Sequence, residues 1–180
     1  MSRALVLARR GKGKTNPNPM VGAVLVVRGR IVGEGFHKRA GDPHAEINAI
    51  EAASGRCAGS TLYVTLEPCV HHGRTPPCVE AIVAAGVESV VVAMLDPDER
   101  VRGKGVKALR KAGLQVEVGD GQHDAAILNR SYIMQRSQGR PFVTYKAAVS
   151  LDGRTAAVNG SSRWISGDAS RSDVHRLRAA

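Results

Sequence analysis

The chain has few aromatic residues and no long apolar run. Aromatic residues make up 3% of 180 residues, which argues against a stacking platform for single-stranded nucleic acid. No apolar stretch approaches the roughly 18 to 20 residues that a membrane span requires. The first apolar stretch covers only residues 4–8 and has no small-residue cleavage site. We therefore expect a short N-terminal helix, no signal peptide, no membrane contact and a cytoplasmic location.

Cysteine is also scarce. Cys57, Cys69 and Cys78 form an odd set in a chain without an export signal, which argues against a disulfide framework. Hydrophobic residues at 43% and charged residues at 23% are globular values and exclude a disordered, collagen-like or coiled-coil chain. The length suits one domain, or one domain and the start of another.

The net charge is +10 and is unevenly distributed. Lys and Arg dominate the first forty residues and the last fifty, whereas the middle of the chain is acidic. A basic rim attracts nucleic acid and a phosphorylated small molecule by the same Coulomb force. The charge therefore favours neither partner, and a solvated surface without a partner explains it equally well.

Strand patterns and helix patterns alternate along the chain. Two β-branched runs, at 21–27 and 31–36, flank a glycine turn and predict a β-hairpin. Asp42-Pro43 predicts the start of a helix over 44–54. Further strands are expected at 60–66, 87–94 and 114–118, and further helices at 78–85, 106–112 and 124–135. This alternation predicts an α/β fold, with a three-layer α/β/α sheet and helices on both faces.

The composition changes near Gly139-Arg140-Pro141, which predicts a domain boundary between 1–140 and 141–180. Beyond it we expect a strand over 142–150, a turn at 151–154 into a second short strand, and a helix starting at Asp168.

One imidazole and two thiols form a candidate metal site. His44, Cys69 and Cys78 are a nitrogen and sulfur donor set that suits one Zn²⁺ and leaves a fourth position for water, as in catalytic zinc sites. Prolines before each of the three predict that they lie at helix N-termini, which stabilise thiolates. A structural zinc site would normally recruit a fourth protein ligand.

Glu46 is the candidate acid–base residue. It lies two residues after His44, and both can reach one site if they lie in the first turn of the helix. Zinc lowers the pKa of its bound water toward about 7, and a carboxylate beside the resulting hydroxide can carry the proton to a ring nitrogen and then to departing ammonia. This set predicts hydrolytic deamination of an amino-heterocycle.

The motif His44-Ala45-Glu46, followed by Pro68-Cys69 and a later cysteine, resembles the cytidine deaminase superfamily. Most nucleoside, tRNA and polynucleotide members carry Pro-Cys-x-x-Cys, whereas eight residues separate Cys69 from Cys78 here. The segment TLEPCVHHGRTPPC at 65–78 resembles the deaminase domain of the bifunctional deaminase/reductase family of riboflavin biosynthesis. The same family is resembled at three further places, which are NPNPMVG at 16–22, His37 and Asp96-Pro97. The resemblance spans essentially the whole chain.

This resemblance implies an activity and a set of contacts. The activity is deamination of 2,5-diamino-6-ribosylamino-4(3H)-pyrimidinone 5′-phosphate to 5-amino-6-(5-phosphoribosylamino)uracil and ammonia. It also implies a small phosphorylated pyrimidine as the partner, no nucleic acid, and a homo-oligomer. The substrate contacts of the family fall on Asn18, His37, His71, Arg74 and Asp96.

Position 98 departs from the family, which usually has Asn where this chain has Asp98. A carboxylate near a phosphate would repel it, and we expect Arg100 and Arg102 to offset that charge.

Residues 145–154 and 162–166 resemble the opening of the family's NADPH-dependent reductase domain. By this resemblance Ala148 and Trp164 match positions that approach NADP, and Ser162 and Arg178 match positions that approach the ribosyl substrate. About 40 residues cannot bury the surface of a second core. We therefore expect only an incomplete NADPH site and no working reductase.

Two other functions stay open. A nucleic-acid or nucleoside base deaminase, which takes its target base out of the stack, is favoured by the +10 charge but opposed by the cysteine spacing and the few aromatic residues. The second alternative is an inactive zinc scaffold, and the presence of Glu46 argues against it.

Overall fold

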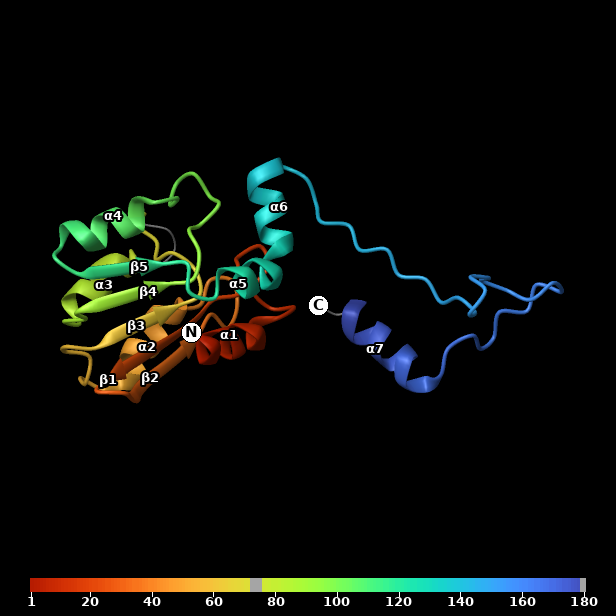
Figure 1. Ribbon diagram of the computed structural model, residues 1–180, viewed down its shortest axis with the longest axis horizontal. Helices are drawn as coiled ribbons and strands as arrows, with labels where there is room; N and C mark the ends of the chain where they lie inside the picture. The colour runs from red at the N-terminus through yellow and green to blue at the C-terminus, as the bar shows by residue number, and fades with distance from the viewer. Residues whose placement is uncertain (72–75, 179–180) are drawn as a thin grey trace. The chain divides into compact units, whose positions relative to one another are not determined.

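The computed structural model describes residues 1–71 and 76–178 (Figure 1). The chain divides into two units, Met1–Pro141 and Phe142–Ala180. Within the described residues, no helix has the length and the apolar character that crossing a membrane requires.

The first unit is built on a sheet of five strands, in the order β2-β1-β3-β4-β5 (Figure 1). β1 pairs antiparallel with β2 and β3, whereas β3, β4 and β5 run parallel. Arg28 and Gly29 form the turn between β1 and β2, both at positive φ, as a two-residue hairpin turn demands. The predicted hairpin is therefore confirmed. The strands are β1 Gly22–Val27, β2 Arg30–Phe36, β3 Thr61–Val64, β4 Ser89–Val92 and β5 Gln115–Val118.

Three helices bury their apolar sides on one face of the sheet. They are α2 (Ala45–Ala53), α3 (Cys78–Ala84) and α4 (Lys104–Lys111). The core between them and the sheet is aliphatic, as the scarcity of aromatic residues requires. Its fully buried members include Leu25, Leu62, Val64, Ile82, Val90, Val92 and Leu109.

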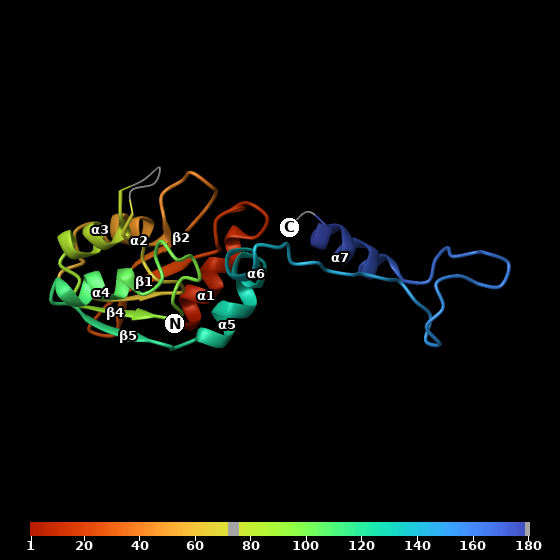
Figure 2. The ribbon, with the colours of Figure 1, turned by 90° about the horizontal axis from the view of Figure 1, so that it is seen from above.

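The opposite face carries α1 (Ser2–Ala8), which continues into the short 3₁₀ helix η1 (Arg9–Gly11), and α5 (Gln122–Leu128). Leu7 packs with Val24 of β1, and Leu5 packs with Ala93 and Ala125. The views in Figures 1 and 2 show helices on both sides of the strands. The three-layer α/β/α prediction is confirmed, with a mixed sheet.

α2 approaches β2 very closely. A Cβ atom at Gly35 would lie 2.3 Å from the Ala45 carbonyl oxygen and 2.5 Å from the Ala49 nitrogen, and one at Gly33 would lie 2.2 Å from the Ala49 carbonyl oxygen. Only glycine allows this contact, which brings the N-terminus of α2 against the end of β2. The helix predicted over 44–54 is confirmed to within one residue at each end, although His44, and not Asp42, is its N-cap.

The single helix predicted over 124–135 was also wrong, because two helices occupy this region. α5 ends at Leu128 and α6 spans Arg130–Gln138, with Asn129 between them. The buried Asn129 side chain accepts a hydrogen bond from the Met20 amide at 2.8 Å and donates one to the Met20 carbonyl at 2.9 Å. These bonds tie the loop before β1 to the junction, and α6 starts in a new direction.

In the second unit, the strands predicted at 142–150 and after residue 154 were wrong, because the described residues 142–178 contain no strand. Strands need hydrogen-bonded neighbours, and these residues pair with none. A turn does form, where the Ser150 amide donates to the Arg154 carbonyl at 2.9 Å. The helix α7, Asp168–Arg178, begins at the predicted residue.

Candidate functional site

The three predicted metal ligands come together at one end of the helical layer. His44 is the N-cap of α2, Cys78 is the first residue of α3, and Cys69 lies in the loop after β3. The His44 Nδ1 atom is 3.1 Å from the Cys78 Sγ and 3.6 Å from the Cys69 Sγ. All three donor atoms lie within 4.8 Å of one another.

The expectation that all three residues lie at helix starts was wrong for Cys69, which is in a loop. Its sulfur nevertheless faces a helix N-terminus, because the Cys78 amide of α3 donates to the Cys69 Sγ at 3.4 Å. An unpaired amide of this kind stabilises a thiolate.

The two thiols differ in acidity. The pKa of Cys69 is lowered to about 4, chiefly by a hydrogen bond from Cys78 and further by the neighbouring His44. The Cys69 sulfur and burial raise the pKa of Cys78 above its usual range. The pair therefore shares one proton near neutral pH, and a bound divalent cation would favour loss of that proton too.

The donor set fits a zinc ion. Ordinary zinc–sulfur and zinc–nitrogen bonds in a tetrahedron separate the nitrogen from each sulfur by about 3.6 Å. The two observed distances, 3.6 and 3.1 Å, lie close to that value. Three protein ligands of this kind leave a fourth position for a small molecule, as catalytic zinc sites do.

Glu46 lies in the first turn of α2, where its acidic side chain also suits the positive end of the helix dipole. It is buried, and burial raises the pKa of its carboxyl group, while the nearby His44 opposes that rise. A buried carboxyl group with a raised pKa beside a candidate metal site suits a general acid–base role.

A cavity of about 140 Å³ opens beside these residues. Most of the site residues predicted from the sequence line this cavity. Arg74 lies outside the described residues, and Cys78 is fully buried and does not line the cavity. The predicted residues that line the cavity are Asn18, His37, His44, Glu46, Cys69, His71 and Asp96.

His37 is held as a neutral imidazole between two polar groups. Its Nδ1 atom is 3.2 Å from the Pro43 carbonyl oxygen, and its Nε2 atom is 3.1 Å from the Asn18 Nδ2. Since an amide NH₂ only donates, Nε2 accepts and Nδ1 carries the hydrogen. Burial lowers the pKa of His37, in keeping with the neutral ring.

His71 reaches the cavity from the loop after Cys69. Its Nδ1 atom is buried and has no hydrogen-bond partner among the described residues. A buried ring nitrogen without a partner is costly, so this atom suits a contact with a bound molecule.

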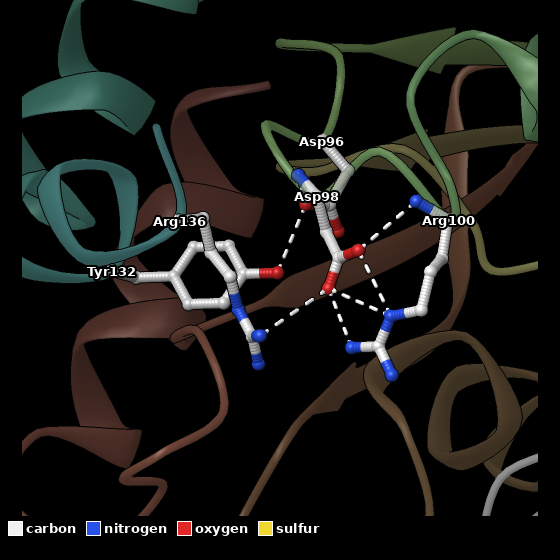
Figure 3. A network of polar contacts seen from close by, with 5 residues as sticks. All are labelled: Asp96, Asp98, Arg100, Tyr132 and Arg136. Carbon is white, nitrogen blue, oxygen red and sulfur yellow. Dashed lines mark hydrogen bonds and ion pairs between the residues drawn. The ribbon is translucent and has the colours of Figure 1, made fainter. Parts of the chain in front are cut away.

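Asp96 is buried, with one carboxylate oxygen fully engaged. Asp96 Oδ1 accepts hydrogen bonds from the Asp98 amide at 2.8 Å and from the Tyr132 hydroxyl at 2.9 Å (Figure 3). Burial and the Asp96 charge raise the pKa of Tyr132, so its hydroxyl remains a donor throughout the physiological range. Asp96 lines the cavity, and its other oxygen accepts no hydrogen bond from the described residues.

Asp98 forms an ion pair with two arginines. Arg100 donates through Nε at 3.0 Å and through Nη2 at 2.6 Å, and the Arg136 Nη1 atom is 3.6 Å from Asp98 Oδ2 (Figure 3). Hydrogen bonds from Arg100 hold the pKa of Asp98 well below its usual range. The expected partner Arg100 is present, whereas Arg102 is exposed and forms no ion pair with Asp98.

The sequence interpretation missed Glu67, Tyr132 and Arg136, which also line the cavity. Glu67 is buried and accepts amide hydrogen bonds at the start of α4, from Gly103 at 2.9 Å and Val106 at 3.0 Å. The available signal was its place in the motif before Pro68-Cys69. Tyr132 and Arg136 lie four residues apart on α6, a spacing that predicts a shared helix face but not what that face contacts.

The residues assigned by resemblance to a reductase lie in the second unit. No hydrogen bond, ion pair or ring contact joins any two of these described residues, which are Ala148, Ser162, Trp164 and Arg178. Trp164 instead packs against Arg171, whose guanidinium carbon lies 4.2 Å from the centre of the ring. None of the described residues 142–178 is buried. Their roles stay predictions.

Comparison with known proteins gives two matching families. The cytidine and deoxycytidylate deaminase zinc-binding region matches residues 1–94, and the RibD C-terminal domain matches residues 141–180. The riboflavin biosynthesis protein RibD of Escherichia coli K12 is 50% identical over 179 residues, which are 99% of this chain and 49% of that protein. The chain spans about half the length of the curated relatives it matches.

Solved structures agree with this likeness. Acinetobacter baumannii RibD superposes with a TM-score of 0.93 at 52% identity, over 99% of this chain and 50% of that one. The diaminohydroxyphosphoribosylaminopyrimidine deaminase/5-amino-6-(5-phosphoribosylamino)uracil reductase of Thermotoga maritima superposes with a TM-score of 0.93 at 45% identity, over 99% of this chain and 51% of that one.

Proposed function

Since the chain belongs to the cytidine and deoxycytidylate deaminase zinc-binding family, we propose that it is a zinc-dependent hydrolase that removes an amino group from a pyrimidine. The substrate we propose is 2,5-diamino-6-ribosylamino-4(3H)-pyrimidinone 5′-phosphate, and the products are 5-amino-6-(5-phosphoribosylamino)uracil and ammonia. The relatives of known structure at 45% and 52% identity, one of which carries this deaminase and a reductase in its name, support this choice.

One observation carries the proposal. Two thiols, an imidazole and a buried carboxyl group meet at the wall of one cavity, although 34 positions of sequence separate the two helix-borne ligands. A purely structural site has no need of a buried carboxylate, because an uncompensated buried carboxyl group costs stability.

His44, Cys69 and Cys78 would hold the metal. A zinc ion bound there supplies a Lewis acid that lowers the pKa of a water molecule toward about 7. Glu46 would take a proton from that water and pass it to the ring nitrogen of the pyrimidine and then to the leaving amino group. Its burial favours this role, because the raised pKa of its carboxyl group lets it hold the proton between the two transfers.

The remaining cavity residues would bind and orient the substrate. Asn18 and His37 form a neutral, hydrogen-bonded pair, and the unpartnered Nδ1 atom of His71 offers one more polar contact. Asp96 would accept a hydrogen bond from the substrate. Arg74 would contribute a guanidinium suited to the phosphate.

The test is release of ammonia from this pyrimidine by the purified protein. We expect turnover that falls at least about a hundred-fold in Glu46→Gln with the zinc content unchanged, since general acid–base catalysis contributes about that much or more. Glu51→Gln, an exposed carboxylate on the same helix, is the matched control and should keep full activity.

Removal of the metal tests whether turnover depends on zinc. A chelator should abolish turnover, and added zinc should restore it. A folded, zinc-loaded protein without turnover on this pyrimidine would refute the proposed substrate and direct the search to RNA and nucleoside substrates. Equal activity of Glu46→Gln and the parent protein would refute the role of Glu46.

A further inference from the structure

Helix α6 brings an arginine to the wall of the cavity. Arg136 lines the cavity together with Tyr132, which lies one turn earlier on the same helix. Its guanidinium lies 5.5 Å from the centre of the Tyr132 ring, which supports the cation from one side. The Arg136 side chain is 30% exposed, so it is open to a molecule entering the cavity.

The guanidinium of Arg136 is short of hydrogen-bond partners. Its closest anionic contact is Asp98 Oδ2, at 3.6 Å, beyond normal hydrogen-bond length. It donates no hydrogen bond to any of the described residues, although it carries five N–H groups. The Asp98 carboxylate therefore attracts the Arg136 guanidinium by charge, while the N–H groups of Arg136 stay available to another acceptor.

Asp98 also forms a second, closer ion pair with Arg100. Arg100 donates two side-chain hydrogen bonds to that carboxylate, at 3.0 and 2.6 Å. Figure 3 shows the Arg100 and Arg136 guanidinium groups on two sides of Asp98. The three side chains together carry one net positive charge, supplied by Arg136, at the cavity wall.

We propose that Arg136 binds the phosphate group of the substrate, with Asp98 and Tyr132 holding its guanidinium in place. The inference rests on the proposed function. A guanidinium with free, forked donors binds carboxylates and phosphates in a bidentate manner, and a phosphate is the anionic group of the proposed substrate. Glu46 and His44 reach the same cavity from α2, whereas Arg136 reaches it from α6, so a molecule bound in the cavity can contact both.

The experiment compares the phosphorylated substrate with the same compound lacking the phosphate, in the parent protein and in Arg136→Gln. We expect the ratio of kcat/KM for the two compounds to fall about ten-fold or more in the variant, the effect of losing one charged hydrogen bond. The loss should lie in KM for the phosphorylated compound. The values for the compound without phosphate should stay unchanged.

Arg140→Gln is the matched control, because Arg140 is exposed, donates to Gln138 and does not line the cavity. It removes the same charge and should leave the ratio unchanged. Arg136→Lys retains a point charge without the fork and should recover part of the ratio. Asp98→Asn should raise KM for the phosphorylated compound several-fold, because the guanidinium loses its anchor.

The outcomes separate the two proposals. An equal loss for both compounds in Arg136→Gln would make Arg136 a structural partner of Asp98 and overturn the phosphate assignment. So would an unchanged ratio, or Arg136→Lys behaving like Arg136→Gln. Absence of turnover in the parent protein would instead refute the proposed function, and the phosphate assignment with it.

Discussion

Asp98 is a nearly buried carboxylate, and the free energy that its desolvation costs is offset by hydrogen bonds and ion pairs with its neighbours. Its side chain is 9% exposed, and it accepts hydrogen bonds from the Arg100 amide and the Arg100 guanidinium. The family resemblance identified this position as a departure, and the charge of the sequence around it predicted Arg100 and Arg102 as compensating residues, of which only Arg100 pairs with Asp98. It did not identify Arg136, because α6 lies more than thirty residues away in the sequence and only folding brings it near.

The acidity of Asp98 predicts a pH dependence of stability. Its hydrogen bonds from Arg100 lower the pKa of Asp98 in the folded protein below the value in the unfolded chain, about 4. The ion pair therefore stabilises the fold above that value, and its contribution is lost as the pH falls below about 4. We expect Asp98→Asn to lower the free energy of unfolding by about 1–2 kcal/mol at pH 7.

This difference between Asp98→Asn and the parent protein should shrink steadily between pH 5 and pH 2, as measured by urea unfolding at each pH. Asp124→Asn is the comparison, since Asp124 is an exposed carboxylate that forms no ion pair with the described residues, so its substitution should change the free energy of unfolding little. A difference for Asp98→Asn that stays constant down to pH 2 would contradict the ion-pair account.

At the scale of elements, the contact between β2 and α2 positions the site. Gly33 and Gly35 let the helix backbone approach the strand, and the N-cap of that helix is His44. The hairpin and the helix were both predictable from local patterns. Their close approach was not, because a glycine in a strand is compatible with a bulge or a turn as well as a tight helix contact.

Gly35→Ala tests this contact. The added Cβ would lie 2.3 Å from the Ala45 carbonyl oxygen, so either the strand or the helix must shift. We expect the free energy of unfolding to fall by about 1–3 kcal/mol or more, the cost of overpacking. The zinc content should fall as well, because the shift moves His44. Urea unfolding and metal analysis measure the two effects.

The matched control is Gly167→Ala, where an added Cβ meets no atom within 4 Å and φ is not positive. Its free energy of unfolding should stay within about 0.5 kcal/mol of the parent value. Similar losses in both variants would show that the effect comes from the chemistry of glycine itself and not from the packing of α2 on β2.

At the scale of the whole molecule, the two units differ in what holds them together. The first contains a sheet with cores on both faces, whereas the described residues 142–178 bury no side chain and form no strand. This unit has no hydrophobic core among the described residues, because its apolar side chains, such as Val143, Tyr145 and Leu151, are exposed. Local strand propensity in 142–150 was therefore insufficient to make a strand.

Amide hydrogen exchange tests this difference. We expect amides at 142–167 to exchange at close to the rate of an unfolded chain, because their hydrogen bonds are few and solvent-exposed. Amides of the central strands β3 and β4 should exchange only through global unfolding, and they serve as the internal reference. Protection at 142–167 that matches the protection of β3 and β4 would show that this segment packs into a stable structure.

The sequence by itself determined the strands of the first unit and helices α1 to α4, because these depend on local periodicity. It also predicted His44, Cys69, Cys78 and Glu46 as candidate metal-binding and acid–base residues, because their motifs have fixed spacing. The family resemblance added Asn18, His37, His71 and Asp96, which line the cavity. Only the tertiary structure decided which way α6 runs, that Tyr132 binds Asp96, and that Arg136 stands beside Asp98. These contacts arise because the buried Asn129 breaks one predicted helix in two and ties the junction to the loop before β1, an event between segments more than a hundred residues apart.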